Sequence, residues 1–304
     1  MPVDVDSVRL HFAPEHLQLL NVLLGFVMFG VALTLKPFDF KRIFQNPKSS
    51  FVGFTSQFLL LPALTFLIVL ILKPMPSVAL GMFLVAACPG GNMSNFISML
   101  AKGNAALSVS LTAYATLAAI VFTPLNFSFW ASLNPSTAPL LKAISISPWQ
   151  MMETVLVLLG IPLLTGMLFA YKFPKLTGKI TKPIHLISIL IFVGFLVIAF
   201  VSNWEYFLQF MKWVIILVLI HNSVALVSGY VWSSLWKLPK CDRRAISIET
   251  GIQNTGLGLV LIFKFFDGLG GMAVVAGWWG IWDLLAGLAI AYIWSRKLPN
   301  GEKA

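Results

Sequence analysis

Residues 249–258 read E-T-G-I-Q-N-T-G-L-G and lie inside an otherwise apolar segment. These ten residues combine one carboxylate, two carboxamides, two hydroxyls and three glycines. In hydrocarbon every backbone N–H and C=O needs a partner, so a glycine-rich polar break at membrane depth is tolerated only where protein or a water-filled cavity surrounds it. An ionisable group at that depth indicates a functional site. We therefore interpret the chain as organised around this break.

A second break occurs in the first half of the chain, where residues 88–95 read C-P-G-G-N-M-S-N. Pro89 removes a backbone donor, and two glycines follow before the apolar pattern resumes. Two interrupted hydrophobic segments in matching places are the best pointer in a sequence to the binding site of a transporter. The pair of breaks therefore favours a transporter.

The composition indicates a polytopic membrane protein. Of the 304 residues, 58% are hydrophobic and 11% are charged, which is too little polar side chain to cover a soluble globule. The net charge of +10 comes from lysines and arginines scattered in short clusters between apolar runs, so it indicates topology and not a nucleic-acid partner. Residues 1–15 lack a basic region and a small-residue cleavage site, and we expect no removable signal peptide.

The sequence argues against an intramembrane enzyme. It contains no H-E-x-x-H motif, no nucleophile elbow and no phosphate-cradling glycine loop, and its four histidines do not cluster. Cys88 and Cys241 have no metal-like spacing, and we expect neither a disulfide nor catalysis from them.

Nine segments are long enough to span a bilayer, which takes about 20 residues each. The predicted spans are residues 17–35, 50–72, 77–101, 104–130, 148–171, 184–203, 206–235, 243–264 and 269–294. The third and eighth contain the breaks, near 89–92 and 250–255. Because these two spans are an odd number of crossings apart, they run in opposite directions, which predicts an inverted repeat. Three spans precede the break in the second half but only two in the first, so a five-plus-five arrangement has lost its first helix here.

The basic residues predict the orientation. Sixteen of the 21 lysines and arginines fall on one side of the nine spans, which the positive-inside rule makes cytoplasmic. We expect a multi-pass protein of the cell inner (plasma) membrane with its N-terminus outside and its C-terminus in the cytoplasm. Residues 1–130 form the first repeat and residues 148–304 the second. The extracytoplasmic connector, residues 131–147, holds either a short surface helix or a plain loop.

Breaking a helix at mid-membrane exposes carbonyl oxygens that suit a hard cation and N–H groups that suit an anion. Glu249 is the leading site residue, because an acid near the bilayer centre costs about 2.5–3.5 kcal/mol on insertion scales and needs compensation. A sodium ion, a shared proton or an inert hydrogen-bonded carboxyl would each supply it. Further oxygen ligands are offered by Gln57, Gln253, Ser108 and Thr112, although hydroxyls also bond back to their own helix.

Other polar residues in the apolar segments have two interpretations each. The second half-helices begin at Ser94 and Asn95 and at Asn254 and Thr255, which either contribute to a site or cap a kinked helix. We expect His221 to be a packing residue, for instance one bonded to the backbone exposed at a break, and not a proton relay. Asp283 carries charge at mid-span and either lines the substrate cavity or is satisfied by packing.

Taken together, these motifs resemble the bile acid:sodium symporter family, in particular the bacterial homologues of the apical sodium-dependent bile acid transporter. The matching segments extend over nearly the whole chain. They are G-V-A-L-T-L-K-P at 30–37, C-P-G-G at 88–91 with S-N at 94–95, G-N at 103–104 with L-S-V at 107–109, H-N at 221–222 and E-x-G-x-Q-N at 249–254.

The resemblance implies a core domain and a smaller panel domain, with the two broken helices crossing at the centre of the core. It also implies two sodium sites. The first would be formed by Ser94, Asn95, Ser108, Thr112 and Glu249. The second would be formed by Gln57, Glu249, Gln253 and the backbone carbonyls of Thr250 and Ile252.

One position departs from the pattern of the family. Similar bacterial members carry a His-Asn pair after a Trp in the last span, whereas here Trp282 is followed by Asp283 and Leu284. An added negative charge opposes a carboxylate substrate unless Asp283 is protonated or paired. The substrate is therefore left open between a bile-acid-like or small organic anion and a non-anionic solute.

We expect a sodium-coupled symporter that carries an organic solute by alternating access, with two Na⁺ and a substrate site near Asn92, Asn254 and Asp283. The leading alternative is a proton-coupled carrier of the same fold, in which Glu249 and Asp283 titrate. We expect a monomer in the lipid bilayer, with no nucleic-acid partner.

Overall fold

The computed structural model describes residue 6, residues 14–202 and residues 204–296, and within them all regular structure is helical, as expected. The elements are α1 (Pro14–Ala32), α2 (Pro37–Gln45), α3 (Pro47–Thr55), the π-helical turn η1 (Ser56–Leu60), α4 (Leu61–Leu72), α5 (Pro76–Ala87), α6 (Met93–Leu100), α7 (Ala105–Leu133), α8 (Ala138–Ile144), α9 (Pro148–Val155), the π-helical turn η2 (Leu156–Gly160), α10 (Ile161–Lys172), α11 (Pro174–Ser202), α12 (Trp204–Leu235), α13 (Lys240–Gly251), α14 (Thr255–Phe265) and α15 (Gly270–Ser295).

Five helical segments of the described chain are long and apolar enough to cross a membrane. They are Pro47–Leu72, Ala105–Leu133, Pro148–Lys172, Val214–Leu235 and Gly270–Ser295. They coincide with five of the nine spans expected from the sequence, so the protein is a polytopic membrane protein. The count of nine stays a prediction, because parts of the first and sixth expected spans lie outside the residues whose side chains are described.

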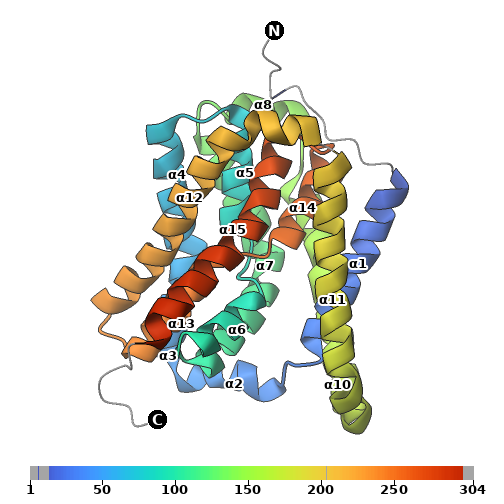
Figure 1. Ribbon diagram of the computed structural model, residues 1–304, viewed down its shortest axis with the longest axis vertical. Helices are drawn as coiled ribbons and strands as arrows, with labels where there is room; N and C mark the ends of the chain where they lie inside the picture. The colour runs from blue at the N-terminus through green and yellow to red at the C-terminus, as the bar shows by residue number, and fades with distance from the viewer. Residues whose placement is uncertain (1–5, 7–13, 203, 297–304) are drawn as a thin grey trace.

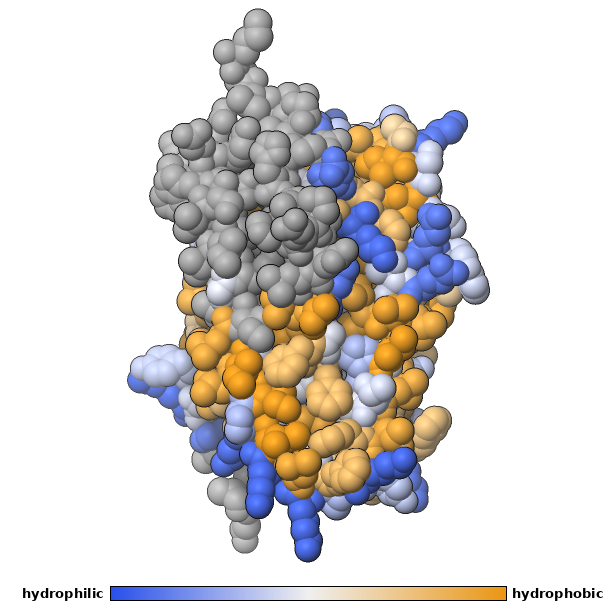
Figure 2. All heavy atoms as spheres, turned by 90° about the vertical axis from the view of Figure 1, so that its right-hand side faces the viewer, coloured by the Kyte–Doolittle hydropathy of each residue, from blue (hydrophilic) through white to orange (hydrophobic). Residues whose placement is uncertain are grey.

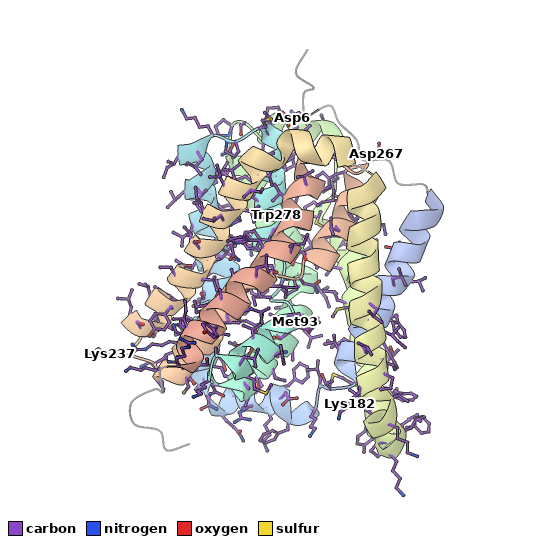
Figure 3. The ribbon with its side chains drawn as sticks, viewed as in Figure 1. Asp6, Met93, Lys182, Lys237, Asp267 and Trp278 are labelled. Atoms are coloured by element: carbon purple, nitrogen blue, oxygen red, sulfur yellow. The ribbon has the colours of Figure 1, made fainter. Side chains whose placement is uncertain are left out.

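The two remaining predicted spans are each divided into two half-helices. α5 ends at Ala87 and α6 begins at Met93, while α13 ends at Gly251 and α14 begins at Thr255. The extended residues between them lie at the two polar breaks found in the sequence. Met93 lies about midway between the two ends of the molecule in Figure 3, which places the first break at mid-depth.

The helix α5 is buried on every side, from Ser77 to Ala87. A helix that is apolar all round belongs in the interior of a bundle, and α5 lies near the centre of Figure 1, beside α15. Small residues permit this close approach: a Cβ on Gly81 would lie 2.8 Å from the Cα of Met272. The helix therefore provides the rigid interior against which the breaks are held.

Three helices form a separate group. In Figure 1, α1, α10 and α11 lie along the right-hand side, and α1 packs against both of the others. Figure 2 shows this face, where hydrophobic side chains cover the middle and hydrophilic ones gather at the lower edge. Exposed leucines such as Leu164 and Leu190 contribute to the apolar area. Such a band is typical of a surface that meets lipid.

Each π-helical turn precedes a proline. Pro62 has no N–H to donate to the carbonyl of Phe58, four residues earlier, and that carbonyl accepts instead from Asn126 Nδ2 at 3.0 Å. Pro162 follows the second π-helical turn, η2, in the same way. The first turn, η1, contains Gln57, which is buried next to the breaks.

The charged ends of the molecule agree with the basic-loop analysis. Lys182 and Lys237 lie at one end in Figure 3, and Asp6 and Asp267 lie at the other. Both lysines belong to the sixteen basic residues that the sequence assigns to the cytoplasmic side, and the orientation itself stays a prediction. The connector contains a short helix, α8, which is one of the two alternatives that the sequence left open.

The two breaks cross and are bonded to each other through their backbones. Gly91 N donates to Ile252 O and Asn254 N donates to Pro89 O, both at 2.8 Å, and Gly90 and Gln253 form an isolated antiparallel bridge. Each break thus supplies the hydrogen-bond partners that the other needs at membrane depth.

Gly91→Ala is expected to lower the stability of the protein. A Cβ at this position would lie 2.9 Å from the carbonyl oxygen of Gln253 and would push the breaks apart, at a cost of roughly 1–3 kcal/mol. The measurement is the apparent Tm of the detergent-purified protein. The control is Gly178→Ala, since nothing lies within 4 Å of a Cβ at Gly178. Equal Tm values for the two variants would contradict the close approach of the breaks.

Candidate functional site

The carboxylate of Glu249, in the last turn of α13, faces three hydroxyl groups. Ser94 Oγ and Ser108 Oγ donate to its Oε2 at 2.5 and 3.2 Å, and Thr112 Oγ1 donates to its Oε1 at 2.7 Å. The side chain is only 2% exposed, and none of these partners is positively charged. An isolated buried carboxylate is costly, so this geometry requires further compensation of its charge.

Asn95 completes the group around Glu249. Its Oδ1 lies 2.9 Å from Ser108 Oγ and 3.1 Å from Thr112 Oγ1. A hydroxyl has one proton, so Ser108 donates either to the carboxylate or to this amide oxygen, and Thr112 donates to one of these two or to the carbonyl of Ser108 at 3.0 Å. The structure therefore brings together all five residues of the first set, which come from α6, α7 and α13.

Gly90 makes room for the Glu249 carboxylate. A Cβ at this position would collide with Oε1 and with the carboxyl carbon of Glu249. The glycine is thus required by a close approach of a side chain to the backbone at the first break.

The second set is centred on two carboxamides. Gln57 Nε2 donates to Gln253 Oε1 and to the carbonyl oxygen of Cys88, both at 2.8 Å. Gln253 Nε2 donates to Thr250 O at 2.7 Å, and Ile252 O accepts from the first break. In the described part of the chain, Glu249 hydrogen-bonds to the first set and not to Gln57 or Gln253.

The residues expected near the substrate lie on and around the breaks. Asn254 caps α14, because its Oδ1 accepts from Leu257 N at 3.1 Å, and its Nδ2 lies 3.8 Å from Met28 Sδ in α1. Asn92 precedes α6, and its buried Oδ1 has no partner within the described residues. The N-cap interpretation is thus confirmed for Asn254, while contact with a substrate stays a prediction.

Asp283 is buried against the second break. It is 3% exposed, and its Oδ2 accepts from Gln253 N at 3.2 Å. The carboxylate therefore satisfies a backbone donor left free where α13 ends. This contact brings a second acidic side chain close to the crossing.

His221 is a packing residue, as expected, but it is not the residue that bonds to a break. Its Nε2 lies 2.6 Å from Thr65 Oγ1, and its ring packs edge-on against Trp279. The neighbouring Asn222 makes the bond instead, with its Nδ2 donating to Gly251 O at 2.7 Å. The suggested bond from His221 is wrong because adjacent helical residues point in different directions.

Two further contacts were not anticipated from the sequence. Ser56 Oγ lies 2.8 Å from Thr250 Oγ1, and Asn126 binds the carbonyl freed by Pro62. The proline was a usable signal for a free carbonyl at Phe58. Nothing in the sequence identified the helix that supplies its partner.

The first set has the chemistry of a site for a hard monovalent cation. It offers carboxylate, hydroxyl and amide oxygens, which are the ligands that such ions prefer. One carboxylate among neutral oxygens balances one positive charge. The second set offers amide and backbone carbonyl oxygens, which also suit a hard cation.

The comparison with known families agrees with this chemistry. The model of the sodium bile acid symporter family matches residues 21–210. The chain belongs to this family. Membership in the symporter family supports a sodium-coupled transporter that is embedded in a membrane and carries a small molecule.

Relatives in the symporter family cover most of the chain. It is 32% identical to the uncharacterized sodium-dependent transporter YocS of Bacillus subtilis, over 93% of this chain and 85% of the relative. It is 36% identical to the probable sodium/metabolite cotransporter BASS2, chloroplastic, of Oryza sativa, over 94% of this chain and 66% of the relative. The human P3 protein is 29% identical, over 86% of this chain, and the match spans 54% of its length.

Thr112→Val is expected to destabilise the protein more than Thr116→Val. The first change leaves the Glu249 carboxylate without one of its three donors, which costs about 1–3 kcal/mol. The second removes only a bond from Thr116 to a carbonyl of its own helix. The measurement is the apparent Tm in a buffer whose only salt is choline chloride. A larger loss for Thr116→Val would contradict the importance of this donor.

Proposed function

We propose that the protein is a sodium-coupled secondary active symporter that moves a small organic solute by alternating access. The observation that carries this proposal is the Glu249 carboxylate, buried at the crossing of two half-helix pairs among neutral oxygens only. A bound cation supplies the compensation that these neighbours do not.

Two Na⁺ bind in this proposal, one at each set of oxygens. The first set is Ser94, Asn95, Ser108, Thr112 and Glu249, whose hydroxyl protons turn away so that their oxygens face the ion. The second set is Gln57, Gln253 and the carbonyls of Thr250 and Ile252, with Glu249 as the shared charge. Sodium supplies positive charge at both sets, and the chain supplies oxygens held by the crossed breaks.

Coupling follows from where these oxygens lie. Both sets include residues of the second break. A cation that draws Glu249 and Gln253 into place therefore also fixes Asn254, which lies between Gln253 and the start of α14. Sodium shifts the equilibrium only by its difference in affinity for the two states of the carrier. Its gradient and the membrane potential, about 2.3 kcal/mol per charge per 100 mV, then drive uptake.

The substrate in this proposal binds beside the crossing, near Asn92, Asn254 and Asp283. Two carboxamides can donate to and accept from an oxygen-rich solute. The family is named for bile acids, and the relative from Oryza sativa is named for a metabolite, which supports a small organic substrate; we propose a bile-acid-like molecule or another small organic anion. The buried carboxylate of Asp283 is the one observation that favours a non-anionic solute instead.

The placement in the cell follows the charge of the loops. We place the carrier in the inner (plasma) membrane as a monomer, with its N-terminus outside and its C-terminus in the cytoplasm. The lysine-bearing end seen in Figure 3 then faces the cytoplasm.

Glu249→Gln is expected to abolish the sodium response. An ion that binds the folded state stabilises it by mass action, by about 2.7 kcal/mol at one hundred times Kd. The measurement is the apparent Tm of the purified protein in NaCl against choline chloride at constant ionic strength. The matched control is Glu153→Gln, which alters an exposed glutamate of α9 and should keep the wild-type response.

A sodium-specific rise that persists in Glu249→Gln would show that this carboxylate holds no cation. If the Tm of the wild type changes with pH but not with the choice of cation, the hypothesis of proton coupling through Glu249 and Asp283 replaces that of sodium coupling.

Asp283→Asn is expected to strengthen the binding of organic anions. The amide oxygen of asparagine can still accept from Gln253 N, whereas the negative charge beside the proposed substrate site is lost. The measurement is the Tm increase produced by a panel of anionic, neutral and cationic solutes in saturating NaCl. Unchanged ranking of the solutes in the variant would show that Asp283 contributes no negative charge to the substrate site.

A further inference from the structure

Two neighbouring residues of α12, His221 and Asn222, contact two different elements that border the second set. His221 and Asn222 are 0% and 1% exposed, so both are inside the bundle. One contacts α4, which follows the turn that bears Gln57, and the other contacts the end of α13. The proposed transport function assigns neither of them a role.

Asn222 holds the middle one of three consecutive carbonyls. The last carbonyls of a helix have no N–H partner within it, and here the carbonyls of Thr250 and Gly251 at the end of α13 and of the following residue, Ile252, each have a different donor. Thr250 O accepts from Gln253 Nε2, Gly251 O from Asn222 Nδ2, and Ile252 O from Gly91 N. The carbonyls on either side of Gly251 are those of the second set, so the Asn222 bond fixes the peptide units between them.

His221 contacts α4, the helix that follows the turn containing Gln57. Thr65 Oγ1 lies 2.8 Å from Leu61 O and 2.6 Å from His221 Nε2, and the tautomer of the imidazole decides which atom donates in the second contact. Leu61 directly follows η1, the turn that contains Gln57. The imidazole thus ties α12 to α4 at Thr65, about two helical turns after Gln57, and Trp279 packs against its ring.

We propose that His221 and Asn222 are a positioning pair for the second cation set. Asn222 holds the carbonyls of Thr250 and Ile252 in register, while His221 holds the helix of Gln57 opposite them. This inference rests on the proposed function, since it concerns residues that orient the ligands of a bound Na⁺. Partners behind metal ligands typically change metal affinity by 10–100-fold when they are removed.

A purely structural role for Asn222 is the competing explanation, because α12 and α13 pack closely along their length. Ser247 Oγ donates to Leu226 O at 2.6 Å, and a Cβ on Gly229 would lie 3.0 Å from the Cα of Ser247. Ser247 therefore provides a matched control: it makes the same kind of buried bond between the same two helices, one turn away from the break.

The test is a NaCl titration of the apparent Tm of the purified full chain, at constant ionic strength with choline chloride. Asn222→Leu is expected to raise the midpoint sodium concentration at least about tenfold, and Ser247→Ala to leave it within about twofold. The Tm without sodium is recorded for both, so that lost stability and lost affinity are separated. Equal midpoints for the two variants at reduced Tm would overturn the proposal and leave a structural bond only.

A second pair of variants tests the His221 side and serves if Asn222→Leu fails to fold. Thr65→Val removes the partner of His221, and we expect it to raise the sodium midpoint severalfold. Its control is Thr165→Val, since Thr165 also follows a π-helical turn and a proline by three residues and donates to its own helix, but is exposed. A midpoint unchanged by Thr65→Val would overturn the role of His221.

The same measurements distinguish a failure of the proposed function from a failure of the positioning pair. A wild-type protein without any sodium-specific rise in Tm overturns the proposed function and this inference together. A wild-type rise that Glu249→Gln abolishes and Asn222→Leu leaves at the same midpoint keeps the function and rejects the positioning pair.

Discussion

The structure depends on the way in which two interrupted helices satisfy each other's backbone inside a membrane. The hydrocarbon of the bilayer offers no hydrogen bonds, so every free N–H and C=O of a break needs a partner in the protein or in a water-filled cavity. Here Gly91 and Pro89 of one break bond to Ile252 and Asn254 of the other. The crossing places Glu249 and Gln253 next to residues more than 140 positions earlier in the chain. The site is therefore a result of the same bonds that make the breaks tolerable.

The breaks themselves could be predicted because their signals are local. Pro89 with the two glycines after it, and the three glycines that follow Glu249, interrupt an apolar pattern, and no neighbouring segment is needed to see this. The shared face of Ser108 and Thr112 follows from helical spacing alone. Their convergence with Ser94 and Asn95 was implied by the family resemblance, and the hydrogen bonds to Glu249 now support it.

Contacts between distant helices could not be predicted in the same way. Whether His221 or Asn222 meets the second break depends on the rotation of α12 about its axis, and one residue changes the direction by about 100°. The partner of the Phe58 carbonyl likewise depends on the depth at which α7 packs against η1. Asp283 was recognised as a charge in an apolar helix, but its bond to Gln253 N could be seen only once the crossing was known.

The contact between Asn254 Nδ2 and Met28 Sδ has a consequence for motion. It lies between α14 and α1, where the group of α1, α10 and α11 meets the crossed helices. A thioether is a weak acceptor on a flexible side chain, so separating this pair costs far less than separating the backbone bonds of the crossing. The interface between α1 and α14 is therefore more easily deformed at this contact than the crossing of the two breaks is. We expect a relative displacement of these two groups of helices to break the contact between Asn254 and Met28 before it breaks the backbone bonds of the crossing.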